Sequence, residues 1–93
     1  MEEPERWQVT KHGIDFETAA RVFDDPNAIM RHDRDIDGEQ LWQTIGSFDG
    51  GFPVLLVVHT MTDQDGDSLV RIISARKATR KERRLYEEGD YLN

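Results

Sequence analysis

Apolar residues recur at helical spacing in one stretch near the start of the chain. Four of them stand three or four positions apart: Phe16, Ala19, Ala20 and Phe23. This spacing predicts a helix over residues 16–23 with one apolar face. Asp15 is expected to cap it, because its carboxylate can accept a hydrogen bond from the free amides of the first turn. Pro26 is expected to end it, since proline disfavours helical backbone in the residue before it.

The middle of the chain carries strand patterns instead. Residues 52–59 form a continuous apolar run rich in β-branched side chains, which predicts a central buried strand. Residues 69–74 predict a second strand, antiparallel to the first and joined to it by a polar loop at 60–68. Shorter runs at 28–31 and 41–45 predict further strands.

A second helix is predicted over residues 80–88. Thr79 and Glu82 have the spacing of a capping box, and Gly89 is suited to end the helix. The helix carries few apolar residues, so its stability must come from docking. A helix, three or four strands and a final helix predict an α+β domain with a mainly antiparallel sheet.

Length and composition narrow the class of protein. The chain has 93 residues, which predicts a single domain over residues 1–93, with 1–10 as an N-terminal arm or edge strand. It has no cysteine, which excludes a disulfide framework, an iron–sulfur site and a Cys₄ zinc site. Its longest apolar run, 54–58, is far shorter than the ~18 residues of a membrane span. The acidic start does not resemble a signal peptide, so the expected compartment is the cytoplasm.

The formal net charge is −7, which at first argues against a nucleic-acid partner. The charge is uneven, however. Residues 1–70 hold 5 basic and 15 acidic side chains, whereas residues 71–84 hold 7 basic side chains and one Glu. Such asymmetry indicates a surface that faces a polyanion or a partner, with a solvated helix face as the simpler interpretation.

One stretch resembles part of a calcium-binding loop. Asp33, Asp35, Asp37 and Gly38 match the first half of an EF-hand, but Thr44 stands where the bidentate glutamate is required. We interpret the stretch as an exposed acidic turn and expect no metal. The chain has no serine-hydrolase elbow and no phosphate-binding glycine loop, so we expect no cofactor.

The remaining candidates for a functional site are basic side chains. Arg71 alternates within the strand at 69–74, with Val70 and Ile72 on the opposite face, and Arg76 follows just past its end. Guanidinium groups bind phosphate bidentately and stabilise charge that develops on phosphorus. Lys11 and His12, if folding brings them near, would complete a metal-free ribonuclease site, although a simple helix-entry turn also accounts for them.

The helix at 80–88 adds four further basic residues. In a ribonuclease they would position the RNA by contacting its phosphates. These expected RNA-binding residues are Arg80, Lys81, Arg83 and Arg84.

Three ordered blocks resemble the BrnT family. Residues 11–26 match its pattern Lys-His-Gly-x-x-Phe-x-x-Ala-x-x-x-Phe-x-Asp-Pro. Residues 42–46 resemble its central Trp-x-x-Ile-Gly, and residues 70–87 resemble its Arg-Ile-Ile-Ser-Ala-Arg-x-Ala…Glu-Arg…Tyr-Glu signature.

The resemblance implies a toxin of a type II toxin–antitoxin system with a RelE-like fold. It implies a metal-independent endoribonuclease that inhibits translation, and a BrnA-like ribbon–helix–helix antitoxin as the partner. DNA would be contacted only through the toxin–antitoxin complex, and no membrane is involved. The basic residues that match the family and are expected to be catalytic are Lys11, His12, Arg71 and Arg76.

The sequence also departs from the family pattern. Thr62 stands where a Thr-x-Arg arginine is usual, and Leu41 stands where an arginine often precedes the central Trp42. Loss of a charge-stabilising group costs roughly 10²–10³ in rate. An alternative therefore stays open, in which a weakly active or inactive relative serves as an antitoxin-binding module in operon autoregulation. A structural protein without nucleic-acid contact is a third, less specific alternative.

Overall fold

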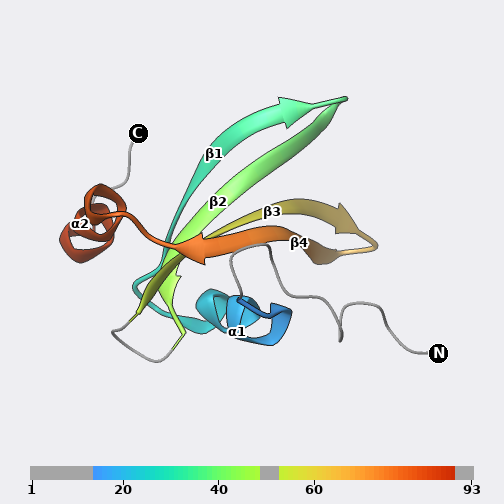
Figure 1. Ribbon diagram of the computed structural model, residues 1–93. Helices are drawn as coiled ribbons and strands as arrows, with labels where there is room; N and C mark the ends of the chain where they lie inside the picture. Colours follow the sequence, from blue (N-terminus) through green and yellow to red (C-terminus); the bar gives the residue numbers. More distant parts are fainter. Residues whose placement is uncertain (1–13, 49–52, 90–93) are drawn as a thin grey trace.

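The computed structural model describes residues 14–48 and 53–89 (Figure 1). Within these ranges the chain forms two helices, a short 3-10 helix and a sheet of four strands. The elements are α1 (Phe16–Arg21), η2 (Val22–Asp24), β1 (Ile29–Ile36), β2 (Glu39–Ser47), β3 (Val54–Gln64), β4 (Asp67–Lys77) and α2 (Arg80–Glu88). The strands follow one another in sheet order β1-β2-β3-β4, and each pairs antiparallel with the next. The predicted α+β architecture is confirmed.

The sheet has a different helix on each face (Figure 1). α1 and η2 pack on the face that we call the α1 face, and α2 packs on the α2 face. Because side chains alternate along a strand, each face has its own core. The α1-face core contains Ala19, Val22, Leu55, Val57 and Ala75. The α2-face core contains Ile29, Ile45, Val54, Leu56 and Ala78, with Leu85 and Tyr86 of α2 packed against it.

Both helices begin as the sequence predicts. Oδ1 of Asp15 accepts a hydrogen bond from the Thr18 amide at 2.8 Å. Thr79 and Glu82 form a capping box, and Gly89 ends α2 in the left-handed conformation with φ 66°. Neither these helices nor any other helix of the described segments is long and apolar enough to cross a membrane.

The strands are longer than the sequence predicts. The prediction of a polar loop at 60–68 is wrong. β3 continues to Gln64 and β4 begins at Asp67, so the turn consists of Asp65 and Gly66. His59, expected at the end of its strand, lies in the middle of β3 and is buried. Most of these outer residues are exposed, so no regular apolar pattern marks them as strand in the sequence.

The first hairpin shows the same difference. The strand expected at 28–31 extends through the acidic stretch to Ile36, and β2 begins already at Glu39. Asp37 and Gly38 form the turn with φ values of 52° and 83°, a pair that the Asp-Gly dipeptide favours in tight hairpins. The described residues contain no cluster of three or more His, Cys, Asp or Glu side chains suited to a metal.

Candidate nucleic-acid interface

The α2 face collects arginines from both edges of the sheet. Strand register places side chains in rows that run across all four strands. Arg34 stands opposite Leu41 and Arg71 stands opposite Thr60 on this face, and Arg76 lies in the row of Ile29, Ile45 and Leu56. β4 therefore contributes Arg71 and Arg76 to the α2 face, and β1 contributes Arg31 and Arg34.

A β-bulge in β1 determines where Arg34 points. The register shifts between His32 and Arg34, so that one extra residue, Asp33, stands between them. His32 and Asp35 share the α1 face, where His32 Nε2 and Asp35 Oδ1 are 2.9 Å apart. Arg34 consequently stands opposite Leu41 and points to the α2 face, because a bulge re-aims the side chains that follow it.

Arg71 is the more exposed of the two arginines on β4. It pairs with Thr60 in register, and Ile72 beside it packs on the α1 face, as the alternation predicts. Its Nη2 lies 3.6 Å from Oε1 of Glu39, with 69% of the Arg71 side chain and 44% of the Glu39 side chain exposed. Such exposed pairs contribute little energy, so the Arg71 guanidinium stays available to an anion.

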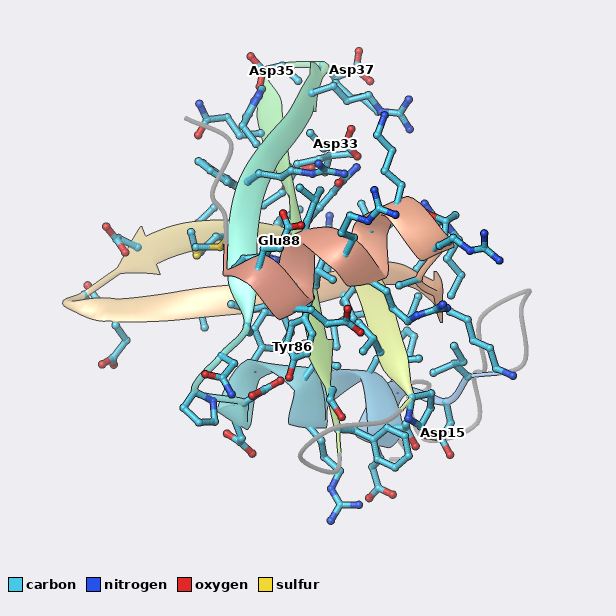
Figure 2. The ribbon with its side chains drawn as sticks, turned by 90° about the vertical axis from the view of Figure 1, so that its left-hand side faces the viewer. Asp15, Asp33, Asp35, Asp37, Tyr86 and Glu88 are labelled. Carbon is cyan, nitrogen blue, oxygen red and sulfur yellow. The ribbon has the colours of Figure 1, made fainter. Side chains whose placement is uncertain are left out.

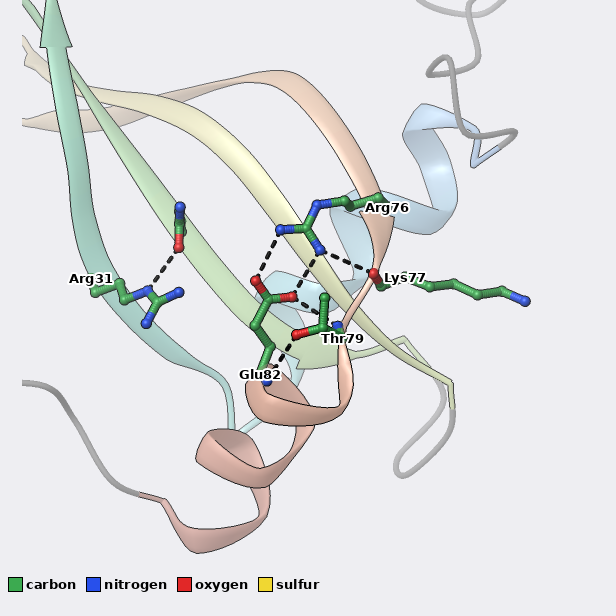
Figure 3. Close-up of polar contacts among 6 residues, drawn as sticks. Arg31, Arg76, Lys77, Thr79 and Glu82 are labelled. Atoms are coloured by element: carbon green, nitrogen blue, oxygen red, sulfur yellow. Dashed lines mark hydrogen bonds and ion pairs between the residues drawn. The ribbon is translucent and has the colours of Figure 1, made fainter.

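Arg76 belongs to β4 itself rather than to the segment after it, and it is bound to α2 (Figure 3). Nη1 of Arg76 donates to Oε1 of Glu82 at 2.8 Å, and Nη2 donates to Oε2 at 2.9 Å. Nη1 also donates to the Lys77 carbonyl at 3.2 Å. Both terminal nitrogens of this guanidinium are therefore engaged, and a phosphate would have to share or displace Glu82.

The pKa values of the pair follow from this contact. The hydrogen bonds from Arg76 lower the pKa of Glu82, against the effect of its partial burial, and the amide of Thr79 adds to the lowering. The hydrogen bonds to Glu82 likewise raise the pKa of Arg76. Since Glu82 is also the third residue of α2 and completes the capping box, one carboxylate fixes the start of α2 and the orientation of Arg76.

The basic residues of α2 lie mostly on its outer side. Arg80, Lys81 and Arg84 are exposed and Arg83 is half-buried, whereas Leu85 and Tyr86 pack on the sheet. α2 therefore presents a cationic surface beside the arginines of β4. Whether an RNA strand contacts these four residues stays a prediction.

Asp25 ties α2 to the rest of the fold. Its Oδ2 accepts from the hydroxyl of Tyr86 at 2.6 Å and from the Ser47 amide at 2.8 Å, and its Oδ1 accepts from the Asn27 amide at 2.9 Å. Tyr86 points from α2 toward the segment after η2 (Figure 2). Burial raises the pKa of Asp25, but these hydrogen bonds outweigh it and leave that pKa below its usual value.

His59 has a structural place on the opposite face. It is fully buried, its Nε2 lies 2.7 Å from Oγ1 of Thr44, and its ring packs edge-on against Phe23 at 4.8 Å. Burial lowers the pKa of His59, so its ring is neutral at pH 7. The sequence-based interpretation of His59 as a packing and hydrogen-bonding residue fits these contacts.

Two of the predicted catalytic residues, Lys11 and His12, lie outside the described residues, as does the predicted arm at 1–10. Their expected approach to Arg71 and Arg76 stays a prediction. The sequence reasoning missed Glu82 as the partner of Arg76, and it missed the arginines of β1. Strand alternation from Ile29 would have indicated the face of Arg31, but nothing in the pattern marks the bulge that redirects Arg34.

Comparison with known protein families gives one match. Residues 2–82 match the family described as ribonuclease toxin, BrnT, of type II toxin-antitoxin system. A comparison with curated proteins found no match.

Proposed function

The chain belongs to the BrnT family of ribonuclease toxins of type II toxin–antitoxin systems, and from this premise we propose that it cleaves RNA on the α2 face of its sheet. The proposed reaction needs no metal ion. The 2′-hydroxyl of one nucleotide attacks the adjacent phosphorus, the bond to the 5′-oxygen of the next nucleotide breaks, and a 2′,3′-cyclic phosphate and a 5′-hydroxyl are left.

Each proposed residue has a chemical task in this reaction. Arg71 binds the scissile phosphate and stabilises the negative charge that grows on its oxygens. Arg76 stands five positions along the same strand and face, about 16 Å from Arg71 at the backbone, so we propose that it holds a neighbouring phosphate in the orientation that Glu82 sets. His12 and Lys11 are proposed to transfer the proton and add positive charge.

The observation that carries the proposal is the position of Arg71. Its guanidinium is 69% exposed, it stands on a paired strand rather than a loop, and it shares the α2 face with Arg76. The basic residues of α2 follow β4 in the chain and lie beside Arg76, which is bound to Glu82 of that helix. An arginine on a paired strand, with further basic residues on the same face, is an arrangement suited to positioning a phosphate and stabilising its charge.

The family also implies an antitoxin as partner. We propose that this antitoxin is of the ribbon–helix–helix type, that DNA is reached only through the complex, and that the toxin has a RelE-like fold. Cleavage of cytoplasmic RNA would inhibit translation and stop growth.

Purified protein tests the proposal when it is incubated with end-labelled RNA in the presence of EDTA. We expect cleavage into products with 2′,3′-cyclic phosphate ends, and a rate roughly 10²–10³ lower for Arg71→Ala. Arg21→Ala, which removes the same charge from the exposed last turn of α1, serves as the control and is expected to keep the rate. RNA left intact by the unaltered protein, or cleavage unchanged in Arg71→Ala, would contradict the proposal.

A second function is favoured by the Arg76–Glu82 pair. This bidentate contact occupies Arg76, and Thr62, which replaces the usual arginine, lies on the same α2 face opposite Leu69. Both features leave less free positive charge for the scissile phosphate, which favours a relative that cleaves RNA weakly or not at all and serves to bind its antitoxin. The mark of this function is a tight complex with the product of the neighbouring gene, formed by a protein that leaves RNA intact even at high enzyme concentration.

A further inference from the structure

Arg31 of β1 is held on the α2 face by a neutral partner. It stands opposite Gln43 in register, and its Nε donates to Oε1 of Gln43 at 2.7 Å (Figure 3). Ile29 and Ile45, two positions along each strand, belong to the α2-face core, so Arg31 and Gln43 point to that side as well. The side chain of Arg31 is half-buried, and one bond fixes the plane of its guanidinium.

The charge of Arg31 is less compensated than that of the arginines on β4. Arg76 is bound to Glu82 and Arg71 lies 3.6 Å from Glu39. Among the described residues, the Arg31 side chain forms no ion pair, and its only hydrogen-bond partner is the uncharged side-chain amide of Gln43. The two terminal nitrogens keep their N–H donors for an anion, in the fork geometry that suits a phosphate.

We propose that Arg31 is an additional phosphate-binding residue for RNA, and that Gln43 is the residue that positions it. This inference rests on the proposed function. β1 and β4 are the two edges of the sheet, so three strand spacings of ~4.8 Å separate their backbones by about 14 Å. That distance exceeds the size of one phosphate group. Arg31 therefore binds a different phosphate from Arg71 and Arg76, and the RNA strand crosses the sheet from β4 to β1.

The test measures binding of a fluorescent single-stranded RNA whose 2′-O-methyl groups prevent cleavage, at several salt concentrations, to the full chain. Arg31→Ala is expected to weaken binding about tenfold, because it removes a charge-assisted hydrogen bond to phosphate. It should also reduce the slope of log affinity against log salt by about 0.7, the contribution of one phosphate contact in a single strand.

Three further variants test separately the charge at position 31, the orientation of Arg31 by Gln43, and the removal of a cation from the other face. Arg31→Lys keeps the charge, so the salt slope should be retained while affinity falls by less than in Arg31→Ala. Gln43→Ala should lower affinity by about two- to fivefold with an unchanged slope, since the cation remains but is no longer oriented. Arg21→Ala, on the opposite side of the molecule, should bind within about twofold of the unaltered protein. Thermal unfolding of each variant verifies that it is folded.

The outcomes distinguish the failure of this inference from a failure of the proposed function on which it rests. If Arg71→Ala weakens binding but Arg31→Ala does not, the inference is overturned and the proposed function stands. An equal loss in Arg31→Ala and Arg21→Ala also overturns it, because net charge and not position then governs binding. If the unaltered protein neither binds nor cleaves RNA, both are overturned together.

Discussion

Glu82 makes two contacts on which the fold depends: it caps the start of α2 and it binds Arg76. Its carboxylate accepts both terminal nitrogens of Arg76 and the amide of Thr79, and only 13% of its side chain is exposed. The sequence predicted the capping role from its spacing to Thr79. It gave no sign of the contact with Arg76, because that contact exists only after α2 has docked on the sheet.

Replacing Glu82 by glutamine is expected to lower the free energy of unfolding by about 2 kcal/mol at pH 7, since a partly buried charged pair loses one partner. The pKa of Glu82 is lowered in the folded state, so its contribution to stability is complete above the usual pKa of 4.5 and is lost as pH falls through the folded value. The stability difference between the two proteins should therefore shrink toward zero on acidification. Urea unfolding at a series of pH values measures this, and a difference that stays constant from pH 7 to pH 3 would refute it.

At the scale of elements, the cap residues were predictable and the hairpins were not. Asp15, Thr79 and Gly89 determine helix ends through local hydrogen bonds and local backbone conformation, which sequence spacing reveals. The outer halves of both hairpins extend beyond the helices, where neither face needs apolar side chains. These segments consequently lack a regular alternation of apolar and polar residues. Their acidic residues instead have a spacing that resembles part of a metal-binding loop.

A local signal for the hairpins did exist. Both turns contain an Asp-Gly pair with positive φ values, 52° and 83° at Asp37 and Gly38, and 54° and 85° at Asp65 and Gly66. Such dipeptides favour tight two-residue turns. Weighing them above the search for a calcium loop would have placed four strands with nearly the observed ends.

The docking of α2 depends on the hydrogen bond between Tyr86 and Asp25. Tyr86→Phe is expected to lower the free energy of unfolding by about 1–2 kcal/mol, because Asp25 keeps its two backbone donors but loses the third. Burial and the neighbouring Asp25 raise the pKa of Tyr86 to about 12. This contribution is complete below the usual pKa of 10.0 and is lost as pH rises toward 12.

Chemical denaturation at pH 7, 10 and 11.5 tests this expectation. The unaltered protein should lose more stability than Tyr86→Phe between the last two pH values. Equal losses in both proteins would show that the Tyr86–Asp25 contact does not hold α2 in place.

At the scale of the whole molecule, the net charge of −7 separates into regions. Asp35 and Asp37 lie at the far tip of the β1–β2 hairpin, away from α2 (Figure 2), and Asp65 lies in the other hairpin turn. Four arginines lie on the α2 face of the sheet: Arg31, Arg34, Arg71 and Arg76. The acidic tips are therefore expected to act on RNA through the long-range field and not through contact.

Removing negative charge from the two hairpin turns tests whether they act on RNA only through the long-range field. Asp37→Asn together with Asp65→Asn keeps residues that tolerate positive φ and removes two negative charges. RNA affinity should rise about two- to threefold at low ionic strength, and the gain should vanish near 1 M salt, where the screening length is about 3 Å. A gain that persists at high salt would mean that the tips touch the RNA.

The central claim is that RNA lies on the α2 face of the sheet. Isotope-labelled protein titrated with a 2′-O-methyl RNA, and followed by backbone and arginine side-chain NMR shifts, tests it most directly. We predict that the largest shifts fall on Arg31, Gln43, Arg71, Ser74 and Arg76, while residues of the helices on the α1 face, such as Ala19 and Val22, stay unchanged. Shifts concentrated on the α1 face or at the hairpin tips, or no shifts from an RNA whose cleavable form the protein cuts, would contradict the account.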